Sequence, residues 1–407
     1  MCLKVKGMFD GSRIVVGLDI GTSKVCAVVG EWHESGPLQI IGLGLASTLG
    51  GVRKGEIVNT ELVEDATRLA LAEAENQSDV EIDSVYLGIT GSHVKGINGS
   101  GVHLIPSIDR EVDKEDIRHV VTAAQPQIST EYKVLHTVGQ VFRVDGQGDI
   151  KNPLGRMASR LEVDVHVVYG QRNRIQNPLR LIKGLGIKVE DFAFNGRVMA
   201  LPVLTAQLGE QGVLVLDIGA GTSEYAVYLN GSIRHCGVLA IGGEHVTNDL
   251  SVGLKISLSR AESLKLSNGN AVCELENAHR TVNLSKGVGV GDKQILLGDL
   301  HRIMNARLEE LFQLIKSDLE RQNLIGKING GILLSGGVSR TPRIGELAQE
   351  VFQLNVLTSA EHSAEKDSRV LRPETLTSIG LAEHAVKRLK AAGSRKNGFF
   401  RWLTQSK

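Results

Sequence analysis

Two stretches of the chain share one pattern of hydrophobic and polar positions. The segments "IVVGLDIGTSKVCAVVG" at 14–30 and "VLVLDIGAGTSEYAVYL" at 213–229 each run from apolar residues through an aspartate and a glycine-containing turn into a second apolar run. Apolar runs rich in β-branched residues predict strands, and glycines between two such runs predict a hairpin turn. Because the hairpins lie in the two halves of the chain, the pattern indicates two similar lobes.

Helical spacing marks further segments. "TELVEDATRLALAEAE" at 60–75 predicts an amphipathic helix, and a last helix is predicted over 372–390, packed on the first lobe. Apolar residues also recur three and four positions apart along 299–323, which predicts a long helix with one buried stripe. The stripe consists of Leu300, Ile303, Met304, Leu308, Leu311, Ile315 and Leu319.

Residues 87–168 follow a different pattern, in which one strand is followed by a helix and two further strands. This order predicts a small α+β module inserted into the first lobe. The glycine-rich segment "GSHVKGINGSG" at 91–101 predicts a hairpin loop. A phosphate-binding loop is disfavoured there because no helix N-terminus follows it.

The patterns divide the chain into five parts. They are the first-lobe core at 13–86 with 169–195 and 371–390, the insertion at 87–168, the second-lobe core at 196–245 with 325–370, the outer part of the second lobe at 246–324, and a linker with a terminal helix at 391–407.

The 407 residues are 42% hydrophobic and 23% charged, which is typical of a globular protein large enough for at least two domains. Basic and acidic side chains balance overall, 46 against 46, but residues 387–407 contain seven Lys or Arg and no acid. The rest of the chain is therefore acidic. The basic tail, and not the body, is expected to meet an anionic partner, and no nucleic-acid binding is expected.

The four cysteines, Cys2, Cys26, Cys236 and Cys273, lack the paired spacing of a disulfide framework or a zinc site, which favours a reducing compartment. The first residues contain no apolar core of a signal peptide, and no run of about 18 apolar residues occurs. We therefore expect a cytoplasmic protein that does not span a membrane.

The two hairpin turns have the composition of phosphate-binding loops. Glycine lets a backbone approach another group closely, and successive N–H groups in such a turn form a concave anion site. A neighbouring carboxylate can hold a phosphate-bound Mg²⁺ through water. One Asp-x-Gly turn alone would be read as a plain hairpin, but two copies favour a nucleotide between two lobes. The candidates are Asp19, Gly21, Thr22 and Ser23 in the first turn and Asp217, Gly219, Gly221 and Thr222 in the second.

Three further features fit a nucleotide site. In "GGILLSGGVSR" at 330–340 an apolar strand runs into Gly336 and Gly337, where a backbone could approach a base or ribose. The pair Gly242 and Gly243 opens a predicted helix. Glu262 and Lys265, spaced i and i+3, project from one helix face, and a solvated surface ion pair is the alternative interpretation.

These motifs resemble the actin, heat-shock-chaperone and hexokinase ATPase superfamily, and within it the FtsA family of bacterial cell-division proteins. The resemblance covers nearly the whole chain, and "IKNPLG" at 150–155 lies in an insertion peculiar to that family. It implies an α/β, actin-like two-lobed ATPase fold with a small α+β insertion subdomain and a C-terminal amphipathic helix. The resembling segments are "VGLDIGTSKVCAVVGE", "IVNTELVEDATRLALAEAE", "SVYLGITGSHVKGING", "VDKEDIRHVVTAA", "KVLHTVGQVFRVDGQGDIKNPLG", "DIGAGTSEYAVY", "ILLSGGVSR" and the basic aromatic tail.

The resemblance implies ATP and Mg²⁺ as ligands. It adds Lys24 to the first phosphate turn, and it places Gly242, Gly243, Glu262, Lys265, Gly336 and Gly337 around the ribose and adenine, with Mg²⁺ held through the phosphates near Asp19 and Asp217. This chain departs from its relatives at Glu224, where they commonly have Asp, and at Asn195-Gly196, where chaperone and actin relatives tend to have a water-orienting Glu or Gln. ATP binding is therefore expected, and hydrolysis, at most slow, stays open.

The resemblance also implies partners. FtsA proteins are expected to receive the C-terminal peptide of FtsZ near the start of the long helix, where this chain has Asp299, Arg302 and Arg307. A basic recess would suit an acidic peptide, and a solvated helix face is the alternative. Self-association into actin-like filaments and contacts with other division proteins are implied as well.

The tail "GFFRWLTQSK" at 398–407 concentrates aromatic residues. Wound as a helix at about 100° per residue, Phe399, Phe400, Trp402 and Leu403 share one face and Arg401 lies outside it. An apolar face flanked by basic residues is typical of a helix that lies in an anionic bilayer interface. A helix packed on its own body, or a frayed end, is the alternative.

We therefore expect an actin-like ATP-binding protein on the cytoplasmic side of the inner membrane at the division site, where it tethers the FtsZ ring. The alternatives are a small-molecule kinase and another actin-like assembly ATPase of the pilus-assembly or shape-determining type. The kinase is disfavoured because no sugar-binding signature is present, and the assembly ATPases because of the insertion at 87–168.

Overall fold

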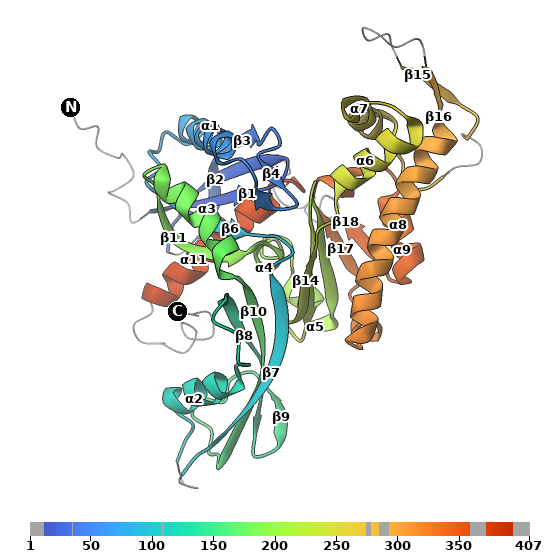
Figure 1. The fold of residues 1–407 in the computed structure, drawn as a ribbon. Coiled ribbons are helices and arrows are strands. Elements are labelled where there is room, and N and C mark those ends of the chain that lie inside the picture. Colours follow the sequence, from blue (N-terminus) through green and yellow to red (C-terminus); the bar gives the residue numbers. More distant parts are fainter. Residues whose placement is uncertain are drawn as a thin grey trace, which may run out of the picture.

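The computed structural model describes residues 12–34, 36–106, 110–273, 278–284, 293–358 and 372–393. Two lobes, each built on a five-stranded sheet, lie side by side, and a third sheet extends from them (Figure 1). No helix among the described residues is both long and apolar enough to cross a bilayer.

The first lobe has the strand order β11-β6-β1-β2-β3. Strand β1 pairs with β2 in antiparallel fashion and with β6 in parallel. Val16 and Leu18 on one face of β1 pack against helices α1 and α3, and Val15 on the other face packs against α11. The elements are β1 (Arg13–Ile20), β2 (Lys24–Trp32), β3 (Gln39–Ser47), β4 (Val52–Arg53), β5 (Glu56–Ile57), α1 (Thr60–Ser78), β6 (Ser84–Ile89), α3 (Arg172–Gly184), β11 (Lys188–Phe194) and α11 (Leu376–Gly393).

The second lobe repeats this plan with the order β14-β13-β12-β17-β18. Strand β12 is antiparallel to β13 and parallel to β17. Leu214, Leu216 and Ile218 of β12 face the core formed with α6 to α9. The elements are β12 (Val213–Ile218), β13 (Ser223–Leu229), β14 (Ser232–Leu239), α6 (Gly243–Leu254), α7 (Leu258–Asn268), β15 (Thr281–Leu284), β16 (Lys293–Leu296), α8 (Leu297–Arg321), η1 (Ile325–Lys327), β17 (Ile332–Ser335), η2 (Gly337–Arg340), α9 (Ile344–Phe352) and β18 (Val356–Thr358). Two short helices, α4 (Asn195–Val198) and α5 (Ala206–Gln211), connect β11 to β12.

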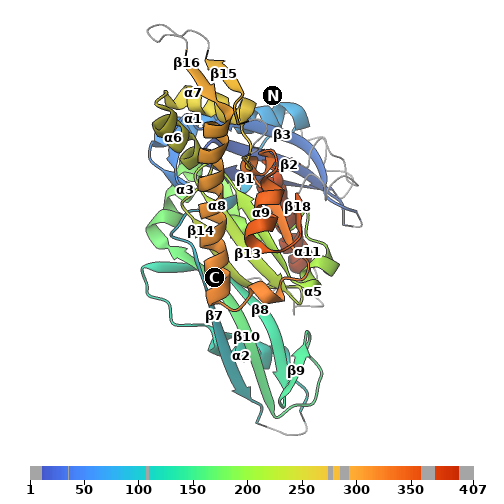
Figure 2. The ribbon, with the colours of Figure 1, turned by 90° about the vertical axis from the view of Figure 1, so that its right-hand side faces the viewer.

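The insertion is a four-stranded sheet of order β7-β10-β8-β9 that carries one helix and extends away from both lobes (Figure 2). Strand β6 pairs with β11 up to Ile89, so the residues from 87 to 89 belong to the first-lobe sheet. The elements of the insertion are β7 (Lys95–Leu104), α2 (Lys114–Ala124), β8 (Tyr132–Val144), β9 (Gln147–Ile150) and β10 (Arg160–Gln171).

The hairpin loop predicted at 91–101 is wrong, because residues 95–101 lie in strand β7. The glycines serve packing. A Cβ at Gly99 would lie 2.1 Å from the carbonyl oxygen of Ala124, and one at Gly101 would lie 2.4 Å from that of Val120. Helix α2 therefore lies directly on the strand backbone, which only glycine permits at this distance.

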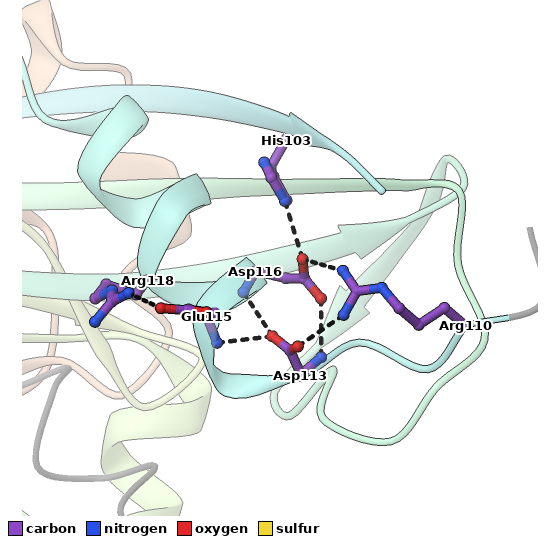
Figure 3. Close-up of polar contacts among 6 residues, drawn as sticks. All are labelled: His103, Arg110, Asp113, Glu115, Asp116 and Arg118. Carbon is purple, nitrogen blue, oxygen red and sulfur yellow. Dashed lines mark hydrogen bonds and ion pairs between the residues drawn. The ribbon is translucent and has the colours of Figure 1, made fainter. Parts of the chain in front are cut away.

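Helix α2 begins at a densely bonded acidic cap (Figure 3). The Asp113 carboxylate accepts hydrogen bonds from the N–H groups of Glu115 and Asp116, at 2.8 and 2.9 Å, and Asp116 accepts one from the Asp113 N–H, at 3.0 Å. The Arg110 guanidinium bridges both carboxylates, and His103 Nε2 lies 3.0 Å from Asp116 Oδ1. This reciprocal capping box fixes the start of the helix.

Candidate functional site

A cavity of about 500 Å³ lies between the two lobes. It is bordered by the β1–β2 and β12–β13 turns, the starts of α6 and η2, and helix α7. Most of the predicted nucleotide-binding residues line it, namely Asp19, Gly21, Thr22, Ser23, Lys24, Asp217, Gly219, Thr222, Gly243, Glu262, Lys265, Gly336 and Gly337.

The two turns are closed by the same hydrogen bond. The Gly21 N–H donates to the Lys24 carbonyl at 2.9 Å, and the Gly219 N–H donates to the Thr222 carbonyl at 2.9 Å. In each turn the aspartate lies two residues before the bonded glycine. The duplicated pattern in the sequence therefore corresponds to duplicated geometry, with both aspartates presented to one cleft.

Gly221 and Gly242 do not line the cavity. A Cβ at Gly221 would lie 2.4 Å from Thr22 Oγ1 in the opposite lobe, and one at Gly242 would lie 2.5 Å from the Gly219 carbonyl oxygen. These glycines let the two turns touch each other and let α6 start directly against the second turn. They therefore influence the position of the cleft walls without lining the cavity.

Three carboxylates gather at the bottom of the cleft. Burial raises the pKa of Asp19, partly offset by a 2.8 Å hydrogen bond from Asn195 Nδ2 and by the charge of Lys24. Burial, and then the charge of Asp19, raise the pKa of Asp217. Burial, and then the charge of Asp217, raise the pKa of Glu224. A nearby cation would stabilise the ionised form of each of these carboxylates.

Glu224 is held across the cleft. Its Oε1 accepts hydrogen bonds from Thr90 Oγ1 of the first lobe and from Thr222 Oγ1, the latter at 3.3 Å. Thr90 follows strand β6 and Asn195 follows β11, and both strands are parallel to β1. Sequence reasoning missed Thr90, although the carboxyl ends of parallel strands meet at one sheet edge and could have indicated it.

Gly336 has φ of +83°, a conformation that favours glycine. A Cβ there would lie 2.5 Å from Asp217 Oδ1 and 2.4 Å from the Ile218 carbonyl oxygen, whereas one at Gly337 would meet nothing within 4 Å. Gly336 therefore lets η2 turn beside the aspartate, and Gly337 leaves a bare backbone surface toward the cleft.

The predicted pair on α7 is formed. Lys265 Nζ lies 2.7 Å from Glu262 Oε2 and donates to the Gly243 carbonyl at 3.1 Å and to Thr247 Oγ1 at 2.8 Å. The lysine is thereby tied to the first turn of α6. Since both members of the pair line the cavity, it is more than a solvated surface pair.

Comparisons with known proteins show the family of the chain. A family model described as "Cell division protein FtsA" matches residues 214–380, and one described as "SHS2 domain inserted in FTSA" matches residues 91–169. The cell division protein FtsA of Pseudomonas aeruginosa is 35% identical over 93% of this chain and 91% of its own length, and that of Neisseria meningitidis is 36% identical over 93% and 92%. This chain belongs to the FtsA family.

Solved structures show the same fold at low identity. A chain of the PilM–PilN type IV pilus biogenesis complex matches with a TM-score of 0.63 and 17% identity, over 91% of this FtsA-family chain and 98% of its own. MreB5 of Spiroplasma citri bound to ADP matches with a TM-score of 0.56 and 14% identity, over 94% and 99%. The actin-like fold with an inserted SHS2 domain is thus confirmed, and the chain is an actin-like cell-division protein.

The three residues predicted to meet FtsZ lie on α8 but differ in exposure. Arg302 is exposed and Asp299 is half-exposed, and the two pair with each other at 3.6 Å. Arg307 is partly buried and binds Asp249 of α6 through two nitrogens, and Glu310 through a third contact. Arg307 therefore connects two helices, and Asp299 and Arg302 form the accessible part of this set.

The residues predicted to bind the membrane, Phe399, Phe400, Arg401, Trp402 and Leu403, lie outside the described residues. Among the described ranges, no group of three or more His, Cys, Asp or Glu side chains is arranged to hold a metal ion. The carboxylates of Asp19 and Asp217 nonetheless fit a cation that reaches them through water, because both lie in the cleft with raised pKa values.

Proposed function

We propose that this FtsA-family chain binds Mg-ATP between its lobes, self-associates at the cytoplasmic face of the inner membrane, and tethers the FtsZ ring there through its C-terminal residues. The observation that carries nucleotide binding is the pair of identically bonded turns, Gly21 to Lys24 and Gly219 to Thr222, around one cavity. A cavity of about 500 Å³ is within the range of sites that enclose small molecules.

The residues divide into roles along the cleft. The backbone N–H groups of the two turns and the Lys24 ammonium would receive phosphate oxygens. Asp19 and Asp217 would hold water molecules of a phosphate-bound Mg²⁺. The charge of this ion would offset the repulsion among the ionised carboxylates. Lys265, Glu262 and the bare backbone at Gly337 would border the nucleoside.

The two-lobed arrangement would couple nucleotide binding to self-association. A ligand that contacts both turns stabilises the closed lobes, so it favours whichever assembly requires that closed shape. Turnover is proposed to be slow at most, because Asn195 donates its amide N–H to Asp19 and a carboxamide cannot act as a general base. An amide committed in this way is poorly placed to activate water.

Membrane attachment would use Phe399, Phe400, Trp402 and Leu403 in the bilayer interface, with the basic residues that follow α11 attracted to anionic headgroups. These basic residues are Arg395, Lys396, Arg401 and Lys407. Each basic residue near an anionic leaflet contributes about 1 kcal/mol, so the attachment would be reversible. FtsZ would meet the exposed part of α8 around Asp299 and Arg302.

The test is cosedimentation of FtsZ with anionic liposomes, with and without the full chain and Mg-ATP. FtsZ should pellet only when the chain is present. Deletion of residues 395–407, or Trp402→Glu, should abolish recruitment and leave ATP binding intact, while Trp402→Phe should retain most of it. Recruitment by the truncated chain would exclude the tail as the anchor, and no recruitment by the intact chain would refute the tether.

The α8 surface is tested in the same assay. Arg302→Glu should reduce FtsZ recruitment without changing how much of the chain itself pellets. The matched control is Arg321→Glu, at the other end of α8 and equally exposed. Equal loss in both variants would indicate a general charge effect and remove Arg302 from the FtsZ site.

A further inference from the structure

An ion pair at the cleft joins the second lobe to the segment that leads into the first lobe. Arg340 lies at the end of η2, directly after strand β17 of the second lobe, and Glu374 lies directly before α11, which packs on the first-lobe sheet. Arg340 Nη2 is 3.0 Å from Glu374 Oε1, and both residues line the nucleotide cavity. Neither residue belongs to the two phosphate turns.

The pair sits where the chain crosses between lobes. Ser335 at the end of β17 donates to the Pro373 carbonyl at 3.4 Å, which ties residue 373 to the second lobe. Ser378 donates to the Cys26 carbonyl of β2 at 3.0 Å, which ties residue 378 to the first. Within these few residues the backbone changes lobe, as expected of a hinge.

The helix that follows Glu374 lies tightly on the first lobe. A Cβ at Gly17 of β1 would lie 2.0 Å from the Ser378 carbonyl oxygen, and a Cβ at Gly380 would lie 2.0 Å from that of Val198. The backbone of α11 thus lies directly on β1 and α4. Glu374 lies in the segment that crosses from Pro373 to Ser378, and Arg340 lies in the second lobe. Their contact therefore depends on the position of this crossing segment, which the closure of the lobes sets.

The pair is only half made. Glu374 Oε2 is buried and has no hydrogen-bond partner among the described residues, while Arg340 uses one nitrogen on Oε1 and keeps most of its side chain exposed. An arginine can bind a carboxylate through two parallel N–H bonds, which is a stronger and more directional contact. A small further closure of the lobes would bring a second guanidinium N–H to Oε2.

We propose that Arg340 and Glu374 are positioning residues that form a latch, drawing the lobes together over a bound nucleotide and setting how long it stays. The proposal rests on the nucleotide binding proposed above. A partly exposed ion pair is individually weak. The latch therefore adds to closure that the ligand itself favours and opens again when the ligand leaves.

The test is the rate at which the full chain releases a fluorescent ATP analogue in Mg²⁺, chased with excess ATP in a stopped-flow instrument. Glu374→Gln and Arg340→Ala should each speed release by about threefold to tenfold, with the association rate nearly unchanged. Arg340→Lys should fall between wild type and Arg340→Ala, because lysine cannot form the second parallel bond. Exchanging the charges, Arg340→Glu with Glu374→Arg, should restore slow release.

The matched control is Glu346→Gln, which breaks the 2.6 Å pair with Arg343 inside the second lobe. It changes the same charge without touching the lobe contact, so release should stay at the wild-type rate. Thermal unfolding of each variant verifies that the chain is folded. Wild-type release from Glu374→Gln, or equal acceleration by Glu346→Gln, would overturn the latch while leaving nucleotide binding intact. A folded wild-type chain that binds no analogue would refute both.

Discussion

Two sites in this molecule bury carboxylates to a similar degree and treat them in opposite ways. In the insertion, Asp116 is 3% exposed, and in the cleft Asp217 and Glu224 are 8% and 5% exposed. Although burial raises the pKa of Asp116, the hydrogen bonds from the Asp113 N–H, Arg110 and His103 lower it below the usual value. In the cleft, burial and mutual repulsion raise both pKa values.

The cleft carboxylates lie deep between the lobes, whereas Asp116 lies just beneath the surface of the insertion, and the donors differ as well. Asp116 receives a backbone N–H, an arginine and a histidine, so the folded chain itself supplies everything that the ionised group needs. Asp217 has near it the hydroxyl of Ser335, whose one proton also lies within reach of the Pro373 carbonyl, and it lies near the negative charge of Asp19. The first arrangement is a completed structural cap. The second is one that a cation would complete, which supports its assignment as the nucleotide and metal end of the cleft.

Removing the carboxylate at the cleft should have the largest effect. In Asp217→Ala the affinity for Mg-ATP should fall about 100-fold, because groups that hold a metal through water commonly contribute 10- to 100-fold. Calorimetry in excess Mg²⁺ measures it, with a second series in EDTA, where the two proteins should bind ATP almost equally weakly. The control is Asp299→Ala on the exposed face of α8, which should bind as wild type. Unchanged affinity in Asp217→Ala would remove this residue from the site.

Removing the carboxylate of the cap should lower stability and leave the affinity for Mg-ATP unchanged. Asp116→Ala leaves Arg110 and the Asp113 N–H without their acceptor, which should cost about 2 to 3 kcal/mol in the free energy of unfolding of the insertion. Hydrogen exchange of α2 amides measures the local loss. Glu115→Ala is the matched control in the same turn, because its pair with Arg118 is exposed and should contribute less than about 1 kcal/mol. Equal effects in both would contradict the distinction between a buried cap and a surface pair.

The sequence predicted those parts of this contrast that depend on local patterns. The two hairpins, the helix of the insertion and the long helix α8 follow from hydrophobic periodicity, and the family resemblance predicted the two-lobed fold. Turn residues such as Asp19 and Asp217 could be named because the motif repeats. Their similar surroundings follow from the similar strands on either side.

Features that depend on contacts between distant segments could not be predicted in this way. Gly99 and Gly101 were interpreted as part of a loop because helix α2, which lies on them, comes later in the chain. Arg307 looked available because its partner Asp249 is on another helix. The hydrogen bond from Thr90 to Glu224, and the lobe-crossing pair of Arg340 and Glu374, join residues whose proximity only the folded lobes determine.

A change of pH should alter the stability contributions of the two sites in opposite directions. Of the three predicted effects, this is the smallest. For Asp116 the folded pKa is lowered, so its contribution to stability is present above the unfolded pKa and is lost as the pH falls through the folded value. For Glu224 the folded pKa is raised, so its contribution is present below the unfolded pKa and is lost as the pH rises through the folded value. In Glu224→Gln the second dependence disappears, because the amide does not titrate.

Without Mg²⁺, the melting temperature of this variant relative to wild type should therefore rise between pH 5 and 9, by an amount corresponding to about 1 kcal/mol. Added Mg-ATP should reduce the difference, since the bound cation lowers the cost of ionising the cleft. A difference that stays constant with pH would show that Glu224 is already ionised throughout this range, and the contrast with Asp116 would then rest on geometry alone.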